Sequence, residues 1–307
     1  MNFNKYMDVL PEIREALENG KPVVALETTT ITHEVPYPRN KEVAKEIEHL
    51  VREHGAVPAT IAIVQGRIKV GLDDETLEYI SKKGPKVTKS SRRDLALILA
   101  KGMDGATTVT TTMMIAEMAG IRTFATGGIG GVHRGAETTM DISADLEELA
   151  QTPVIVVSAG AKAILDLGLT LEYLETKGVP VVAYQTEYLP AFYTRTSKYK
   201  VDARVDTPKE IAEIFKVKQD AGIKGALLVT NPIPEAYAMN EAVMNKAIDD
   251  ALIEMEKAGI SGKDSTPFLL NKVSEATGGE SLEANIQLIL NNAILGAKVA
   301  VEYSKLV

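Results

Sequence analysis

Two residues of this chain occupy positions suited to nucleophilic and acid–base chemistry. Lys162 follows an apolar strand pattern at 154–157, and the pattern places it in the first turn of a helix that opens at 159. A helix N-terminus and partial burial both disfavour a charged amine, so we expect a lowered pKa and a Lys162 that can form an imine. Glu27 follows a strand pattern at 22–26, where desolvation is expected to raise its pKa toward that of a general acid. A structural role, with the charge satisfied by neighbours, is the alternative for both residues.

The segment 89–94 combines three cations and two hydroxyl residues immediately before a helix pattern, and Lys89 stands at its start. Fixed positive charges together with free backbone N–H groups at a helix start form a common phosphate site. A solvated, charged helix start is the alternative. The next helix pattern begins among five threonines at 107–112, which either line a polar pocket or bond to the backbone.

A glycine-rich loop at 127–131 lies between Thr126 and His133. Glycines allow a ligand to approach backbone N–H groups closely. The spacing does not match the dinucleotide fingerprint G-x-G-x-x-G, because the sixth position counted from Gly128 is His133. The loop therefore predicts a ligand-binding segment but not a nicotinamide dinucleotide site.

Two aspartates, Asp141 and Asp145, stand at the start of a helix pattern that runs through Leu149. Carboxylate oxygens are the ligands that Mg²⁺ and Mn²⁺ prefer, so the pair suggests a metal site. Negative charge that complements the helix dipole is the alternative explanation.

The composition limits the classes of function. The net charge is −8, which disfavours a general nucleic-acid binder, although a few local cations suffice for a small anionic substrate. The chain has no cysteine, which excludes disulfides and thiolate chemistry. The N-terminal segment lacks a signal-peptide core, and no stretch reads as a membrane span. We therefore expect a soluble, cytoplasmic protein without membrane or nucleic-acid partners.

The elements that must position these side chains alternate between strands and helices. Short apolar runs indicate buried strands, and apolar residues at helical spacing indicate helices. Strand patterns lie at 22–26, 59–64, 67–70, 122–125, 154–157, 179–184 and 226–229, and helix patterns lie at 10–17, 41–52, 93–100, 108–119, from 207, and at 281–303. This alternation predicts a single α/β domain over residues 1–307, with helices on both faces of a mainly parallel or mixed central sheet.

Several long segments together resemble the pseudouridine-5'-phosphate glycosidase family, also known through indigoidine-synthesis proteins of the A type. They follow the family's order from Val23 to Ala293, so the resemblance covers nearly the whole chain. The segments are ALETTTITHEVPYPRN, VTKSSRRDLA, GATTVTTTM, ATGGIGGVHRGAETTMDISADL, SAGAKAILDLGLTLEYLETKGVPVVAYQTEYLPAFYTRTS and ANIQLILNNA.

The resemblance implies a three-layer α/β/α fold, a homotrimer and a reversible reaction of pseudouridine 5'-phosphate with water to give uracil and ribose 5-phosphate. The family is understood to open the sugar ring and attach C1′ to a lysine amine, so that an iminium serves as the electron sink. Carried over by position, Lys162 matches the nucleophile, Glu27 the proton donor and Asp141 the ligand of one Mn²⁺ per subunit, with other divalent ions possible. The positions that match the family's substrate-binding residues are Lys89, Val109, Ser143, Ala144 and Asp145. We add Thr126, His133 and Asn285 as further candidates for the pocket.

The sequence departs from the family pattern at Glu34, where glycine is usual, at Arg39, where glutamine is usual, and at Ser158, where some members have cysteine. Glu34 introduces a carboxylate beside the expected site, so the pH optimum or the substrate affinity is expected to differ. Three other functions stay open: another Schiff-base phosphosugar enzyme of aldolase or isomerase type, an accessory role in pigment formation, and a non-catalytic ligand sensor. The joint presence of nucleophile, proton donor and metal-binding aspartate favours the glycosidase.

Overall fold

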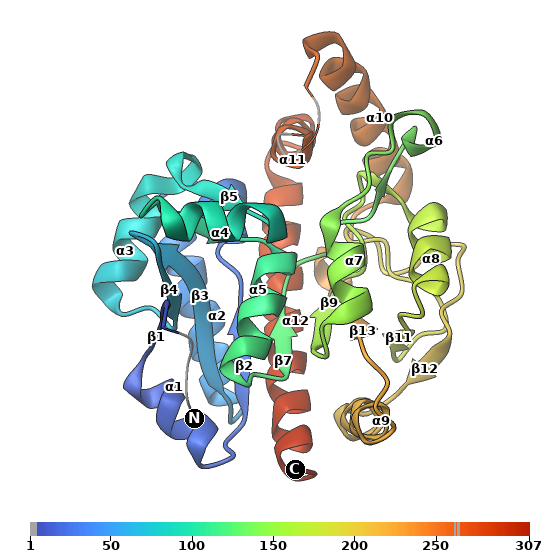
Figure 1. Ribbon diagram of the computed structural model, residues 1–307. Helices are drawn as coiled ribbons and strands as arrows, with labels where there is room; N and C mark the ends of the chain where they lie inside the picture. Colours follow the sequence, from blue (N-terminus) through green and yellow to red (C-terminus); the bar gives the residue numbers. More distant parts are fainter. Residues whose placement is uncertain (1–4, 261, 263–264) are drawn as a thin grey trace.

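The alternating elements build one eleven-stranded sheet in a computed structural model that describes residues 5–260, 262 and 265–307 (Figure 1). The strand order is β1 (Met7–Val9), β4 (Arg67–Val70), β3 (Val57–Val64), β2 (Val23–Leu26), β7 (Thr123–Ala125), β9 (Ile155–Ser158), β13 (Leu227–Thr230), β11 (Val181–Tyr184) and β12 (Ala203–Val205). Two more strands, β5 (Thr88–Ser90) and β6 (Gly105–Thr107), attach through β6 to β3.

The strands from β3 to β12 along this order are all parallel, whereas β4 and β6 run antiparallel to β3. The sheet is therefore mixed, as the sequence predicts. Because the central strands are parallel, their carboxyl ends meet at one edge, and the loops that follow β2, β7 and β9 leave the sheet side by side.

Helices cover both faces of the sheet, which confirms the layered α/β fold. On one face α12 (Glu280–Ser304) packs against α2 (Arg39–Glu53), α9 (Pro208–Asp220) and strands β2, β7 and β9. On the other face α5 (Val109–Ala119) packs against β2 and β7 and contacts α4 (Arg92–Ala100) and α7 (Ala144–Gln151), which in turn contacts α8 (Leu167–Thr176). Figure 1 shows α12 passing behind the middle of the sheet and α5 in front of it.

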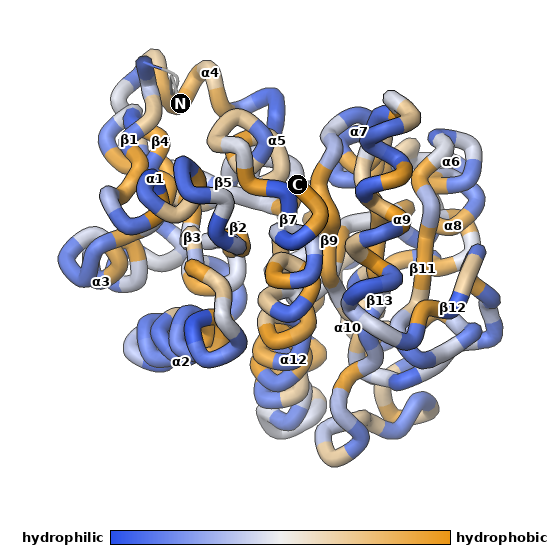
Figure 2. Tube along the Cα trace, turned by 90° about the horizontal axis from the view of Figure 1, so that it is seen from below, coloured by the Kyte–Doolittle hydropathy of each residue, from blue (hydrophilic) through white to orange (hydrophobic). Residues whose placement is uncertain are grey.

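Helix α12 is long and apolar enough to cross a membrane by length and composition, contrary to the expectation that no segment reaches that threshold. Within its most apolar window, however, 72% of the residues are buried inside the protein. A core helix of a soluble protein passes the same test. Figure 2 shows the contrast in hydropathy between the hydrophobic central strands, such as β9 and β11, and the largely hydrophilic α2 on the outside.

Further helices complete the fold. They are α1 (Pro11–Glu18), the π-helical turn η1 (Thr30–Glu34), α3 (Asp74–Lys83), η2 (Gly84–Lys86), α6 (Ala136–Thr139), η3 (Glu235–Tyr237), α10 (Glu241–Ala258) and α11 (Ser265–Ala276). A small antiparallel pair, β8 (Val132–His133) and β10 (Leu165–Asp166), joins the glycine-rich loop to the segment after Lys162. The predicted helix start at 159 is wrong: residues 159–164 form a loop that the backbone of the glycine-rich segment holds in place.

Candidate active site

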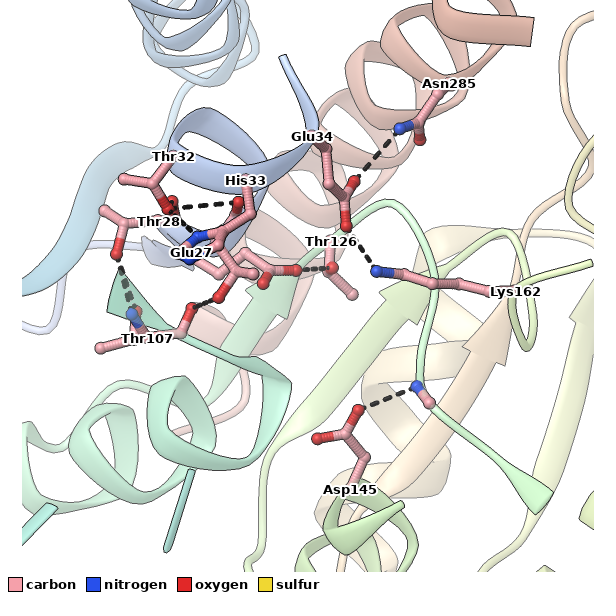
Figure 3. Close-up of polar contacts among 12 residues, drawn as sticks. Glu27, Thr28, Thr32, His33, Glu34, Thr107, Thr126, Asp145, Lys162 and Asn285 are labelled. Atoms are coloured by element: carbon pink, nitrogen blue, oxygen red, sulfur yellow. Dashed lines mark hydrogen bonds and ion pairs between the residues drawn. The ribbon is translucent and has the colours of Figure 1, made fainter. Parts of the chain in front are cut away.

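Polar side chains from separate loops meet at the carboxyl edge of the parallel strands (Figure 3). Glu27 follows β2, Thr126 follows β7, and Lys162 lies in the loop after β9. The backbone of this last loop is tied to the glycine-rich loop, because Ile129 N donates to Gly160 O at 3.0 Å and Lys162 N donates to Ile129 O at 3.1 Å. The parallel sheet thus brings the two residues with the strongest chemical signals in the sequence into one centre.

The Glu27 carboxyl group has an unusual pKa and a fixed orientation. Burial raises its pKa to about 7, although the nearby Lys162 charge acts in the opposite direction. The Thr126 hydroxyl donates a hydrogen bond to Glu27 Oε1 and fixes the carboxylate. A carboxyl group with a pKa near neutrality can both give and take a proton under ordinary conditions, as the sequence predicts for Glu27.

Lys162 forms an ion pair that the sequence does not predict. Its Nζ lies 2.5 Å from Glu34 Oε1, and Asn285 Nδ2 donates to Glu34 Oε2 at 3.1 Å. Burial works to lower the Lys162 pKa, but the charges of Glu34 and Glu27 outweigh it, and the pKa is raised. The expected lowering is therefore wrong for the protein without substrate, because no helix begins at Lys162 and a carboxylate contacts its amine.

Asp145 connects helix α7 to the glycine-rich loop. Its Oδ1 accepts bonds from Thr110 N and Thr110 Oγ1 at 3.0 and 2.6 Å, and its Oδ2 accepts from Gly130 N at 2.8 Å. A Cβ at Gly130 would lie 2.1 Å from Ser143 Oγ, so only glycine permits this approach. Ser143 is the N-cap of α7 and accepts a bond from Asp145 N, and Ala144 is the first residue of the helix.

Lys89 and Val109 lie at the end of the centre where the sequence predicts phosphate. Lys89 belongs to β5, and its pKa is lowered by burial and by the charge of Lys162. Val109 opens α5, whose N-cap, Thr108, makes no side-chain capping bond. The two arginines of the same run lie elsewhere: Arg92 pairs with Glu148, and the Arg93 side chain is 78% exposed. Of the three cations in segment 89–94, only Lys89 is therefore placed in the centre.

His133, on β8, lies close to Asp141, which is in the segment between α6 and α7. His133 N donates to Asp141 O at 3.0 Å. Burial lowers the pKa of the His133 ring, and the Asp141 charge acts against that shift. Within residues 5–260, 262 and 265–307, no group of three or more His, Asp or Glu side chains is arranged to hold a metal.

Three residues near the centre, Glu34, His33 and Tyr193, are missing from the site that the sequence predicts. Glu34 is evident in the sequence only as a departure from the family pattern. Burial and the Lys89 charge lower the His33 pKa to about 4, and burial together with the Glu34 charge raises the pKa of Tyr193. Only the position of residues 33 and 34 in the loop after Glu27 gives a signal in the sequence.

A cavity of about 500 Å³ opens next to this centre. His33, Glu34 and Asn285 line it on one side, and residues of η2 and α11 line it on the other. Asn285 Oδ1 is buried and has no hydrogen-bond partner in the part of the chain that the structure describes. Asn285 thus keeps an unused buried acceptor, while its amide nitrogen donates to Glu34.

Comparison with known proteins assigns this arrangement to a family. Residues 12–302 match the family described as indigoidine synthase A like protein. The chain is 60% identical over 301 residues to the pseudouridine-5'-phosphate glycosidase of Hahella chejuensis, covering 98% of this chain and 99% of that protein. It is 58% identical over 300 residues to the pseudouridine-5'-phosphate glycosidase of Escherichia coli K12, covering 98% and 96%.

Solved structures show the same fold. The prealnumycin C-glycosynthase AlnA, crystallised with ribulose 5-phosphate, superposes with a TM-score of 0.91 at 41% identity and covers 99% of this chain and 98% of its own. An indigoidine synthase A-like protein of Thermotoga maritima superposes with a TM-score of 0.89 at 32% identity, with 99% of both chains covered.

Proposed function

This chain belongs to the family of indigoidine synthase A like proteins, and from this membership we propose that it is a pseudouridine-5'-phosphate glycosidase. The reaction is the reversible cleavage of the C–C bond between uracil and ribose 5-phosphate. Relatives named for this activity share 55–60% of their residues with the chain over nearly its full length. A related C-glycosynthase that binds a pentulose phosphate supports a phosphosugar ligand.

The observation that carries the proposal is the meeting of Lys162 and Glu27 at one edge of the sheet (Figure 3). A C-nucleotide has no heteroatom leaving group, so its glycosidic bond needs an electron source on C1′ and a proton donor for the base. An amine bonded to C1′ supplies the first, and a carboxylic acid with a pKa of about 7 supplies the second. Lys89, a half-buried lysine whose charge interacts with those of Lys162 and Glu27, supports a phosphosugar ligand.

In the proposed mechanism, the neutral Lys162 amine bonds to C1′ as the sugar ring opens at its C1′–O bond, and a proton passes from the nitrogen to the freed ring oxygen. The nitrogen lone pair then forms a C=N bond while the C1′–C5 bond to uracil breaks, and C5 takes a proton from Glu27. Uracil leaves, and an iminium links Lys162 to the pentose phosphate. Water adds to C1′, the C–N bond breaks, and ribose 5-phosphate is released with Glu27 protonated again.

The phosphate group is proposed to bind at Lys89 and at the N-terminus of α5. The backbone N–H of Val109 is one of the free donors of a helix start, and such donors favour anions. Asp145, Ser143 and Ala144 at the start of α7 are proposed to bind the sugar. His133, Thr126 and Asn285 complete the substrate pocket at the glycine-rich loop and at α12.

We further propose that the enzyme uses one Mn²⁺ or a similar divalent ion held by Asp141. Asp141, beside His133, supplies the carboxylate oxygens that such an ion prefers, and an ion that keeps several water ligands needs only one or two carboxylates, so the residues present suit the metal. When bound, such an ion supplies positive charge for the oxygens of an anionic substrate. A homotrimeric assembly, which the family resemblance implies, and a cytoplasmic location, which the sequence favours, are also part of the proposal.

The proposal is tested by incubating the purified protein with Mn²⁺ and pseudouridine 5'-phosphate, adding borohydride, and recording mass spectra of the intact protein and its peptides. We expect uracil release and a reduced pentose-phosphate adduct on the peptide that contains Lys162. Uracil release without an adduct would retain the activity and reject the lysine mechanism. An adduct with ribose 5-phosphate alone, without uracil release, would favour an aldolase or isomerase that acts on phosphosugars.

A further inference from the structure

The mechanism above requires a neutral Lys162 amine, yet the structure places a carboxylate against it. Glu34 Oε1 lies 2.5 Å from Lys162 Nζ. The Glu34 side chain is only 5% exposed and that of Lys162 is 14% exposed, so solvent screens the pair weakly. No step of the mechanism uses Glu34, and its role in the protein is therefore open.

The backbone and a neighbouring helix hold Glu34 in this position. It is the last residue of the π-helical turn η1, and Val35 N closes the turn by donating to Thr30 O at 3.2 Å. Its second oxygen accepts the amide hydrogen of Asn285 from α12. Because both oxygens are occupied, the carboxylate is oriented before any ligand arrives.

The other charges around Lys162 come from different elements and act at longer range. Glu27, after β2, and Asp145, on α7, favour the ammonium form, whereas burial disfavours it. Lys89, on β5, adds positive charge that acts against the ammonium form of Lys162. His33, on η1, has a pKa of about 4 and is therefore neutral near pH 7. Glu34 differs from all of them because it makes the direct hydrogen bond.

We propose that Glu34 is the positioning residue of Lys162: it holds the side chain as an ammonium ion toward Asn285 and so sets the pH above which Lys162 becomes a nucleophile. The proposal deepens the proposed function and rests on it for the identity of the nucleophile. Burial and the Lys89 charge favour the neutral amine of Lys162, and the Glu34 charge opposes them. Without the Glu34 charge, this opposition is weaker. The amine then loses its proton at a lower pH.

The test measures the titration of Lys162 in the full chain without nucleotide. Wild type and Glu34→Gln are labelled briefly with acetic anhydride over a series of pH values, and the peptide that contains Lys162 is quantified by mass spectrometry. We expect the midpoint in Glu34→Gln to fall by about one pH unit or more, which is about a tenfold gain in labelling rate below the midpoint. An unchanged midpoint would overturn the proposal.

Two further variants separate charge from packing. Glu34→Asp keeps the charge, and its midpoint is expected to lie closer to that of wild type than the midpoint of Glu34→Gln does. Glu48→Gln removes a carboxylate that is hydrogen-bonded to Thr60, away from the centre, and is expected to leave the Lys162 midpoint unchanged. An equal fall in Glu34→Asp and Glu34→Gln would mean that packing, rather than charge, sets the titration.

If Glu34→Gln does not fold, the titration of Lys162 in the wild-type protein still tests the proposal. The proposal requires a Lys162 midpoint at or above the ordinary lysine value of about 10.4, and a midpoint below that value would reject it. Failure of the proposed function is recognised separately, because acetylation needs no nucleotide. A protein that shows the expected Glu34 effect but releases no uracil would support the role of Glu34 and contradict the proposed glycosidase activity.

Discussion

Two ion pairs of this protein each join a well-buried carboxylate to a cation, and they differ in what the cation can do. At the strand edge, Glu34 binds Lys162 through one oxygen at 2.5 Å. Between α4 and α7, Glu148 receives two parallel bonds from Arg92, both at 2.7 Å, and a further bond from the Thr152 hydroxyl. The Glu148 side chain is fully buried, whereas that of Arg92 is 47% exposed.

The difference separates a structural contact from a chemical one. An arginine keeps its charge under all ordinary conditions and matches a carboxylate with a planar fork, so the Arg92–Glu148 pair acts as a clamp between helices. A lysine can give up its proton and become a nucleophile. Burial and opposite charge act on both pairs, but only the Lys162–Glu34 pair lies where loss of a proton changes the chemistry.

The largest expected effect comes from removing the lysine of the first pair. Lys162→Met keeps the length of the side chain but has no amine, so no covalent intermediate can form. We expect uracil release to fall by more than about 10³-fold, as for removal of other nucleophiles, and the borohydride-trapped adduct to disappear. Steady-state uracil release and peptide mass spectra measure the two effects. Substantial residual activity in a correctly folded variant would contradict the assignment of the nucleophile.

The second effect tests the titrating carboxylate next to the same pair. The Glu27 pKa is about 7, so the acid form is depleted as the pH rises above that value. Wild-type kcat for pseudouridine 5'-phosphate cleavage is expected to decline above about pH 7 where proton donation limits the rate. Glu27→Gln should lower kcat by about 10²–10³-fold and remove this limb from the pH–rate profile. A limb of the same midpoint in the variant would assign the titration to another group.

A third change breaks the clamp instead of the active centre. Glu148→Ala removes three hydrogen bonds and leaves Arg92 without its partner, although the exposed part of Arg92 can turn toward water. Because of that exposure we expect a loss of about 2 kcal/mol in the free energy of unfolding, rather than the larger cost of a fully buried orphan charge. Urea denaturation of wild type and variant measures this change in the free energy of unfolding. Uracil release per folded molecule should stay close to wild type, and a large loss of kcat would argue against a purely structural clamp.

Some strands of the sheet are predictable from the sequence and others are not. The buried strands β2, β3, β9, β11 and β13 are predictable because runs of apolar residues with many β-branched side chains have few alternatives. The strands β1, β5, β6 and β12 carry too few consecutive apolar residues for a pattern, whereas β7, which is equally short, lies within the predicted strand at 122–125. The strand order depends on contacts between distant segments, which composition and periodicity do not encode.

The local conformation at Lys162 shows the same limit. Small residues after a strand resemble a helix start, but the backbone bonds between Ile129, Gly160 and Lys162 impose a loop instead. Glu34 is 128 residues away from Lys162 in the chain, so no spacing rule connects them. Side chains at the ends of parallel strands are predictable as a group because the topology collects them, whereas their partners and the direction of a pKa shift are not.

The smallest expected effect comes from replacing the arginine of the Arg92–Glu148 pair by lysine, the residue type of the Lys162–Glu34 pair. Arg92→Lys keeps the positive charge opposite Glu148 but replaces two parallel N–H bonds by one point charge. We expect a loss of about 1 kcal/mol in the free energy of unfolding, less than for Glu148→Ala, because the carboxylate keeps a cation and its bond from Thr152. The new lysine, exposed on one side, should label with acetic anhydride far faster than Lys162 at the same pH. Equal labelling of the two lysines would mean that burial and the Glu34 contact do not protect Lys162, and the distinction between clamp and active centre would then fail.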